Sequence, residues 1–296
     1  MSGTAWDALK AQADLPAGIP DVSNQDQMNN VYVLAKALVY VRTRIESYRT
    51  EVRLNCMGAI DTELGGRTLA LGRELAAYVI AADLVVLEPD EDVAFRAWLR
   101  RTLTEILDNR TLQSTQEDRP NNWGTNAGAS RAAVAVYLAD AAELARTAKV
   151  FKGWLGDRAS YAGFSYGDLS WQYDESKPVG IDPLGAVKSG ESIDGALPEE
   201  MRRGCSFQFP PCPTNYPWGG LNGAVVCAAI LSRQGYDAWN WEKQALRRAA
   251  QFLYDLDRRY PDRSTVTEST ASRSRAARRR WARTARRKRT PIIPSW

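Results

Sequence analysis

The stretch NNVYVLAKALVYVRTRI, from Asn29 to Ile45, decides the fold class of this chain. Its apolar residues Val31, Leu34, Leu38 and Val41 recur every three to four positions, which is the spacing of one face of an α-helix. A strand would show alternation with a period of two, and no part of the chain sustains that pattern between turn signals. The stretch therefore predicts a helix and argues against a sandwich or a parallel sheet.

Helical spacing continues through most of the first 155 residues and resumes near the end of the chain. Turn signals such as Gly65 and Gly66 separate the helices, and long helices with short connections form antiparallel hairpins. The chain is therefore predicted to be all-α. The predicted helices are Asn29–Ile45, Tyr48–Ile60, Arg67–Leu87, Asp90–Asn109, Gly128–Leu138, Ala139–Leu155, Gly220–Tyr236 and Trp239–Tyr260.

The bulk composition is that of a soluble globular protein, with 44% hydrophobic and 25% charged residues among 296. The longest apolar run, Ala76–Leu87, is shorter than the roughly 18 to 20 residues that a membrane span needs. The chain as written also begins without the basic and apolar regions of a signal peptide. We therefore expect no membrane partner.

The positive charge is concentrated at the end of the chain. Ten of the 39 basic residues and no acidic ones lie between Arg273 and Trp296, which leaves 29 basic against 35 acidic residues before them. We predict one helical domain over residues 1–260 and a disordered or peripheral basic tail over residues 261–296. The tail is either a solvated end or a place for an anionic glycan or nucleic acid, and nucleic acid is a candidate partner only there.

The four cysteines and the absence of histidine restrict the chemistry. No CxxC spacing occurs and no histidine nitrogen exists, so neither a metal site nor a cofactor is predicted. Cys205 and Cys212 enclose the short segment CSFQFPPC. They either form a disulfide or remain reduced, buried thiols.

Three motifs in a fixed order suggest a family. They are RPNNWGTNAGASRAAVAVYLAD at Arg119–Asp140, DGALPEEMRRG at Asp194–Gly204, and the tyrosine-bearing NYPWGGLNGAVVCAAILSRQGYDAW at Asn215–Trp239. Paired asparagines before a helix of small residues, an Arg-Gly segment and a later tyrosine resemble the alginate lyase family of polysaccharide lyases. Order and spacing agree over roughly Trp6–Tyr254.

This resemblance implies an incomplete (α/α) toroid of antiparallel helical hairpins, in which the loop-rich segment Tyr161–Trp218 lines the cleft. It implies β-elimination on an alginate-like, uronate-containing polysaccharide, and a periplasmic or secreted protein. Asn122 and Arg203 would neutralise the uronate carboxylate, and Tyr216 would serve as base and then as acid. The candidate substrate-binding residues are Asn121, Trp123, Asn126, Arg202, Trp171 and Trp218.

The chain also departs from the family pattern. The family histidine is absent, because Trp123 directly follows Asn122, and the interval from Arg203 to Tyr216 is longer than the family's. The alternative function is therefore a catalytically inactive, glycan-binding homologue.

Simpler structural roles remain open for several of these residues. The paired asparagines could cap a helix, since asparagine is a favoured N-cap. Tyr216, Trp218 and Trp171 could be packing aromatics, and Arg131 is expected at the surface, paired with an acid. A third function would be glycoside hydrolysis by the carboxyls of Asp168 and Asp194.

Overall fold

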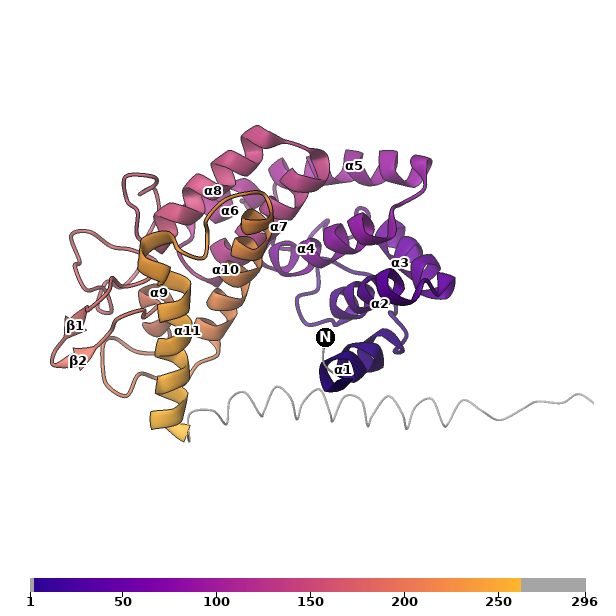
Figure 1. Cartoon of the computed structure of the whole chain (residues 1–296). Helices are drawn as coiled ribbons and strands as arrows, with labels where there is room; N and C mark the ends of the chain where they lie inside the picture. The colour runs from indigo at the N-terminus through magenta and orange to yellow at the C-terminus, as the bar shows by residue number, and fades with distance from the viewer. Residues whose placement is uncertain (1–2, 262–296) are drawn as a thin grey trace, which may run out of the picture.

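A computed structural model describes residues 3–261 of the chain (Figure 1). Over these residues the fold is all-α, as the helical spacing predicts, with one short antiparallel hairpin of two strands. The helices are α1 (Gly3–Ala13), α2 (Asn29–Thr43), α3 (Glu46–Gly58), α4 (Thr68–Val85), α5 (Pro89–Thr104), α6 (Leu112–Asp118), α7 (Asn122–Leu138), α8 (Ala141–Leu155), α9 (Pro198–Met201), α10 (Tyr216–Arg233) and α11 (Trp241–Arg259). The strands are β1 (Val187–Lys188) and β2 (Glu191–Ser192).

Two parts of the predicted organisation remain predictions. One is the closure of the helical hairpins into an incomplete toroid. The other is the division into a domain over residues 1–260 and a basic tail, because everything after Pro261 lies outside the described residues. A contact between that tail and nucleic acid is untested for the same reason. Within residues 3–261, no helix combines the length and the apolar character needed to cross a membrane.

Helix α7 lies in the middle of the fold, with α4 on one side and α10 on the other (Figure 1). Every residue from Gly124 to Ala135 is buried, so this helix has no exposed face and no apolar stripe. That explains why periodicity predicted a helix only from Gly128 onward, whereas α7 begins at Asn122. Its small residues allow neighbouring helices to approach closely on every side.

Two hydrophobic cores meet at α7. The first core lies among α2–α5 and contains Leu75, Phe95 and Trp98, while Ala133 of α7 reaches into it. The second core, which includes Trp154, Leu221 and Leu253, lies among α8, α10, α11 and the loop-rich segment, and Ala129 and Ala132 of α7 belong to it. The two cores hold α7 between them, and its first residues are thereby fixed against the loop-rich segment.

Two glycines set the distance between α7 and its neighbours. A Cβ atom added to Gly72 of α4 would lie 2.9 Å from the backbone nitrogen of Ala127, and one added to Gly223 of α10 would lie 2.6 Å from that of Asn126. Backbone atoms cannot move aside as a flexible side chain can. Both helices therefore contact α7 at the turn that follows the paired asparagines.

Gly223→Ala is expected to lower the free energy of unfolding by at least about 1 to 3 kcal/mol, because the new methyl group overpacks the α7–α10 contact. Gly219 of the same helix has no atom within 4 Å of the equivalent position, so Gly219→Ala is the matched control. Its expected effect is a gain of roughly 0.5 to 1 kcal/mol from the helix propensity of alanine. Urea unfolding of both variants measures the difference, and equal effects would contradict the close approach.

The expectation of a surface position for Arg131 is wrong. This α7 side chain is 2% exposed and donates to Gln116 at 3.0 Å and to Glu117 at 2.9 Å. It also donates to Glu143 of α8. A buried guanidinium is tolerated here because several oxygen acceptors surround it.

Glu74 of α4 is a buried carboxyl, and its Oε2 atom has no hydrogen-bond partner among the described residues. Burial raises its pKa to about 8, opposed by Arg73 and assisted by Asp21 and Asp26. The folded protein therefore keeps a proton on Glu74 that the unfolded chain, with an ordinary carboxyl pKa, releases above about pH 5. This group makes stability fall as the pH rises from about 5 to 8.

Glu74→Gln is expected to remove that part of the pH dependence, which amounts to at most roughly 1.4 kcal/mol per pH unit for one proton. The variant should be more stable than the wild type at pH 8, with the difference shrinking toward pH 5. Thermal unfolding at several pH values tests this. Parallel curves for the two proteins would show that Glu74 is ionised in the folded state.

Candidate active site

The side chains of the paired asparagines have different surroundings at the start of α7. Asn121 is the N-cap, and its side-chain oxygen accepts a hydrogen bond from the backbone nitrogen of Trp123 at 3.1 Å. The capping role is therefore observed for Asn121. The side-chain Oδ1 atom of Asn122 is buried and has no hydrogen-bond partner within residues 3–261. This oxygen is a buried acceptor that the fold leaves unsatisfied. Any hydrogen bond to a uronate carboxylate would have to come from the Nδ2 group of the same carboxamide, which is a donor.

Two further candidate substrate-binding residues, Trp123 and Asn126, contact protein groups. The side chain of Asn126 is buried and donates to the backbone oxygen of Asn122 at 2.7 Å. Trp123 is half-buried, and the guanidinium of Arg119 lies 5.4 Å from its ring centroid. The Asn126 carboxamide nitrogen is thus occupied within its own helix.

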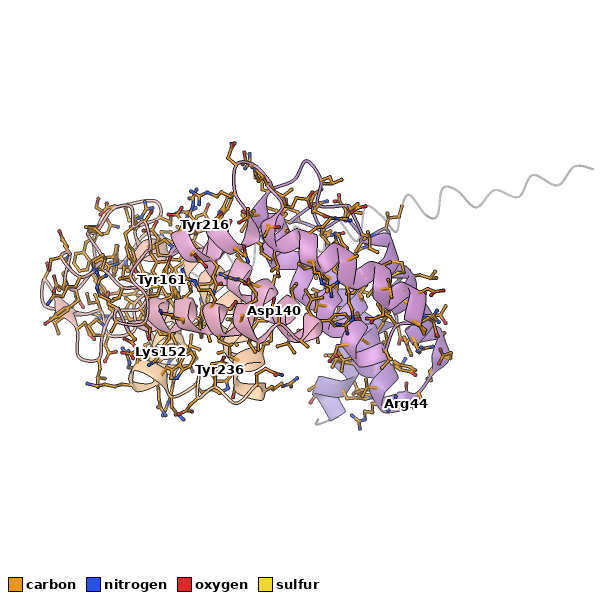
Figure 2. All side chains as sticks on the ribbon, turned by 90° about the horizontal axis from the view of Figure 1, so that it is seen from above. Arg44, Asp140, Lys152, Tyr161, Tyr216 and Tyr236 are labelled. Carbon is orange, nitrogen blue, oxygen red and sulfur yellow. A yellow bond between two sulfur atoms is a disulfide. The ribbon has the colours of Figure 1, made fainter. Side chains whose placement is uncertain are left out.

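The Arg-Gly segment and the tyrosine meet despite the long interval between them. The guanidinium carbon of Arg203 lies 3.9 Å from the ring centroid of Tyr216, the first residue of α10. Tyr216, labelled in Figure 2, is 41% exposed, so its ring is not a core aromatic. The arginine and the tyrosine that the family resemblance marks are thus in contact.

Sequence reasoning missed Glu200, which connects these parts. It belongs to α9, is 1% exposed, and accepts a hydrogen bond from the backbone nitrogen of Asn122. Its Oε2 atom lies 3.8 Å from Nη1 of Arg203. Burial raises the pKa of the Glu200 carboxyl to about 8, while Arg203 and the Asn122 N–H act in the opposite direction. The acidic pair in LPEEMRRG was the only signal for it in the sequence.

Arg202 points away from this group. Its guanidinium pairs with Glu199 and occupies the space that the missing side chain of Gly167 leaves open. Glu199 also accepts a hydrogen bond from the backbone nitrogen of Gly167 at 3.2 Å. Arg202 therefore holds the loop-rich segment against α9.

The other two candidate tryptophans contact protein groups. Trp171 is fully buried, 4.8 Å from the ring of Phe207 and 5.6 Å from that of Phe209, so neither face is open to a sugar. The predicted substrate contact of Trp171 is wrong for this reason: its ring fills the second core. Trp218 is 39% exposed, and its Nε1 atom donates to Asp257 of α11 at 3.0 Å.

Cys205 and Cys212 form a disulfide, which decides between the two alternatives left open by the sequence. Seven residue steps could span ~23 Å when extended, yet the two Cα atoms lie 6.1 Å apart. The bridge thus removes most of the extra length between Arg203 and Tyr216. The other two cysteines, Cys56 and Cys227, are buried thiols whose pKa values are raised by burial.

The double variant Cys205→Ser/Cys212→Ser is expected to lose roughly 2 to 3 kcal/mol of stability, because a short loop is no longer closed in the unfolded chain. Any turnover should fall several-fold, since Arg203 and Tyr216 are then joined only by a flexible loop. Urea unfolding with and without a reductant measures the first effect. The reductant should destabilise the wild type and leave the double variant unchanged, and an equal response of both would contradict the disulfide.

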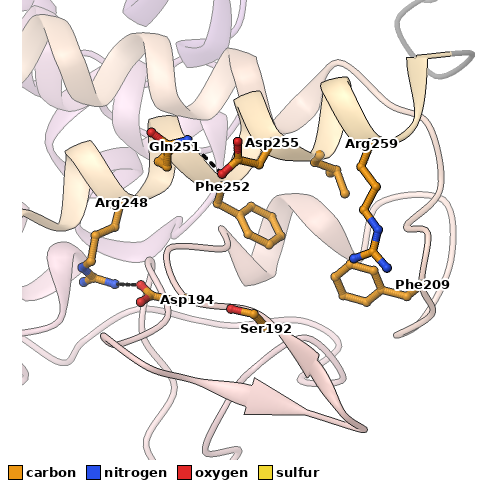
Figure 3. Close-up of a pocket in the computed structure, with 9 residues that line it drawn as sticks. Ser192, Asp194, Phe209, Arg248, Gln251, Phe252, Asp255 and Arg259 are labelled. Carbon is orange, nitrogen blue, oxygen red and sulfur yellow. Dashed lines mark hydrogen bonds and ion pairs between the residues drawn. The ribbon is translucent and has the colours of Figure 1, made fainter.

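A hollow of about 330 Å³ between α11 and the β1–β2 hairpin is separate from these contacts (Figure 3). Asp194 on its edge pairs with Arg248 at 2.6 Å. Hydrogen bonds from Ser170, together with one from Ser206, lower the pKa of Asp168. A glycosidase acid needs a raised pKa, so these surroundings do not favour glycoside hydrolysis by Asp168 and Asp194.

Comparison with known proteins agrees with the motif that begins α7. The family model described as alginate lyase matches residues 22–166. Over these residues the chain is similar to the alginate lyase family, as the motif suggests. No curated protein and no solved structure matches the chain.

This match supports polysaccharide lyase activity at the level of the family. The match includes Asn121, Asn122 and Trp123, whereas Arg203 and Tyr216 lie beyond it. The roles of those two residues therefore depend on the second and third motifs and on the geometry described above.

Proposed function

We propose that this protein is a polysaccharide lyase that cleaves a uronate-containing, alginate-like polysaccharide by β-elimination. One observation carries the proposal: a continuous set of contacts runs from Asn122 through Glu200 and Arg203 to Tyr216. Asn122, Arg203 and Tyr216 are the residues expected from the family resemblance, and Glu200 joins the first of them to the other two. The proposed substrate is an anionic polysaccharide, and no cofactor takes part in the proposed steps.

The proposed chemistry assigns one task to each side chain. The C5 proton of a uronate is a weak acid until the charge of the adjacent carboxylate is neutralised, which the Asn122 carboxamide and the Arg203 guanidinium would do. The ionised phenol of Tyr216 would take the C5 proton. The C5–H electron pair forms the C4–C5 double bond as the C4–O bond breaks, and the Tyr216 hydroxyl returns the proton to the leaving oxygen.

The position of Arg203 supports the role of Tyr216. The guanidinium carbon of Arg203 lies 3.9 Å from the centroid of the Tyr216 ring, so a positive charge stands beside the side chain that is proposed to remove the proton. One residue then removes and returns the proton on the same face of the sugar. This route needs no histidine, which agrees with the absence of histidine from the chain.

The test is incubation of the wild-type protein with a panel of polyuronates and glycosaminoglycans. An unsaturated uronate product absorbs in the ultraviolet, so the expected result is a rise in absorbance on at least one polyuronate. Retention of the protein on the immobilised polymers is measured in parallel. No rise on any polymer from a folded protein would contradict the proposal.

Retention without a rise would favour the inactive, glycan-binding homologue. Two observations favour this alternative. The histidine that the family usually carries close to the paired asparagines is absent, and Trp123, which directly follows Asn122, has its ring beside the Arg119 guanidinium.

A further inference from the structure

Glu200 lies where three elements begin or end. It belongs to α9, its carboxylate accepts from the first backbone N–H of α7, and a Cβ atom added to Gly220 of α10 would lie 3.2 Å from its Oε1 atom. The side chain is 1% exposed. It is thus enclosed between the segments that carry Asn122, Arg203 and Tyr216.

We propose that Glu200 is a positioning residue of the active site, which holds the start of α7 and the Arg203 guanidinium together so that Arg203 stays over Tyr216. This inference rests on the proposed lyase function and extends it to a residue that does not contact the substrate.

The bonding of the Glu200 carboxylate supports this role. Oε1 accepts the Asn122 N–H, whereas Oε2 has no hydrogen-bond partner among the described residues and faces Nη1 of Arg203 at 3.8 Å. A buried carboxyl with one free oxygen is costly for stability and is poorly explained as a structural ion pair. Its orientation toward Arg203 gives it a task that an apolar side chain of the same size could not perform.

The two neighbouring acids of α9, Glu199 and Glu200, pair with different arginines. Glu199 is 4% exposed and directs its oxygens to Arg202 and to the backbone nitrogen of Gly167. Each acid of α9 thus has its own arginine, and only the pair of Glu200 and Arg203 reaches Tyr216. The arginine beside Tyr216 is therefore held by Glu200 rather than by Glu199.

The first test is a double-mutant cycle on turnover. Burial raises the pKa of Glu200 to about 8, so turnover is measured at about pH 9, where its carboxyl is ionised. Glu200→Gln keeps an oxygen for the Asn122 N–H but removes the negative charge that faces Arg203 at that pH. We expect kcat to fall ~10- to 100-fold, the range for a lost hydrogen bond or ion pair to a charged group, with KM little changed. Adding Glu200→Gln to Arg203→Ala should cause no further loss. Effects that multiply would overturn the proposal, because Glu200 would then act independently of Arg203.

Glu74→Gln is the matched control, since Glu74 is also buried with an unpartnered oxygen but lies in α4. It should leave kcat unchanged, and a loss equal to that of Glu200→Gln would show that replacing any buried carboxyl by an amide lowers turnover. If Glu200→Gln does not fold, Glu200→Asp replaces it in the cycle, because the shorter side chain withdraws the same charge from Arg203.

A second test does not need activity. The Nε–H signal of Arg203 in nuclear magnetic resonance, assigned with Arg203→Lys, should be ordered in the wild type, mobile in Glu200→Gln and unchanged in Glu74→Gln. An Arg203 signal that is the same in all three would overturn the positioning role. A wild type without lyase activity whose Arg203 signal responds as expected would sink the proposed function and leave the positioning role intact.

Discussion

Tyr216→Phe is expected to reduce product formation ~10²- to 10⁴-fold, the range that one general acid–base group contributes. The phenylalanine ring keeps its place under the Arg203 guanidinium, so the substitution removes the hydroxyl and leaves the packing of the ring. Binding of the polysaccharide should change little, because the hydroxyl acts on the C5 proton and the leaving oxygen. Absorbance of the unsaturated product gives kcat, and retention on the polymer gives binding.

Tyr254→Phe is the control for this variant. Tyr254 of α11 is 53% exposed, with the guanidinium of Arg258 5.7 Å from its ring centroid, so it also combines an exposed tyrosine with an arginine. It lies outside the candidate active site and should keep wild-type turnover. Residual turnover of Tyr216→Phe within a few-fold of the wild type would exclude Tyr216 as the base and would leave elimination without an assigned base.

Helices could be predicted from sequence wherever one face meets water. Asn29–Thr43 shows a clear stripe because α2 packs on one side, and the observed helix ends within two residues of the predicted range. Helix α7 lacks such a stripe because both cores enclose it, so its first turns were missed. The short helices α6 and α9 span too few residues to show a period.

The same reasons explain what was and was not foreseen in the candidate site. Asn122, Arg203 and Tyr216 could be proposed from motifs because the family resemblance marks those positions. Trp171 and Arg131 were misplaced because burial of a loop aromatic, or of a charge on a helix without a stripe, is decided by tertiary packing. Glu200 could not be recognised, since its task appears only when α9 is placed against the starts of α7 and α10.

Asn122→Ala is expected to lower kcat ~10²- to 10³-fold, as the loss of one donor to a developing negative charge does in other enzymes. The reason is that negative charge grows on the carboxylate as the enolate forms, and the Nδ2 group of Asn122 would stabilise it as a hydrogen-bond donor. The Asn121 side chain already caps the helix. The helix should still form, because the cap at Asn121 and the bond between the Asn122 backbone nitrogen and Glu200 are both kept. Product absorbance and thermal unfolding measure the two effects separately.

Two further substitutions show which asparagine performs the chemistry. Asn122→Asp places a second negative charge against the uronate carboxylate, so its turnover should be no higher than that of Asn122→Ala, with weaker binding in addition. Asn121→Ser keeps a capping oxygen for the Trp123 nitrogen and should retain most of the activity if Asn121 only caps the helix. The reverse pattern, with Asn121→Ser inactive and Asn122→Ala active, would transfer the neutralising role to Asn121. It would also mean that the Asn122 carboxamide does not contact the uronate carboxylate, because the charge of the uronate can be neutralised only by the group that contacts it.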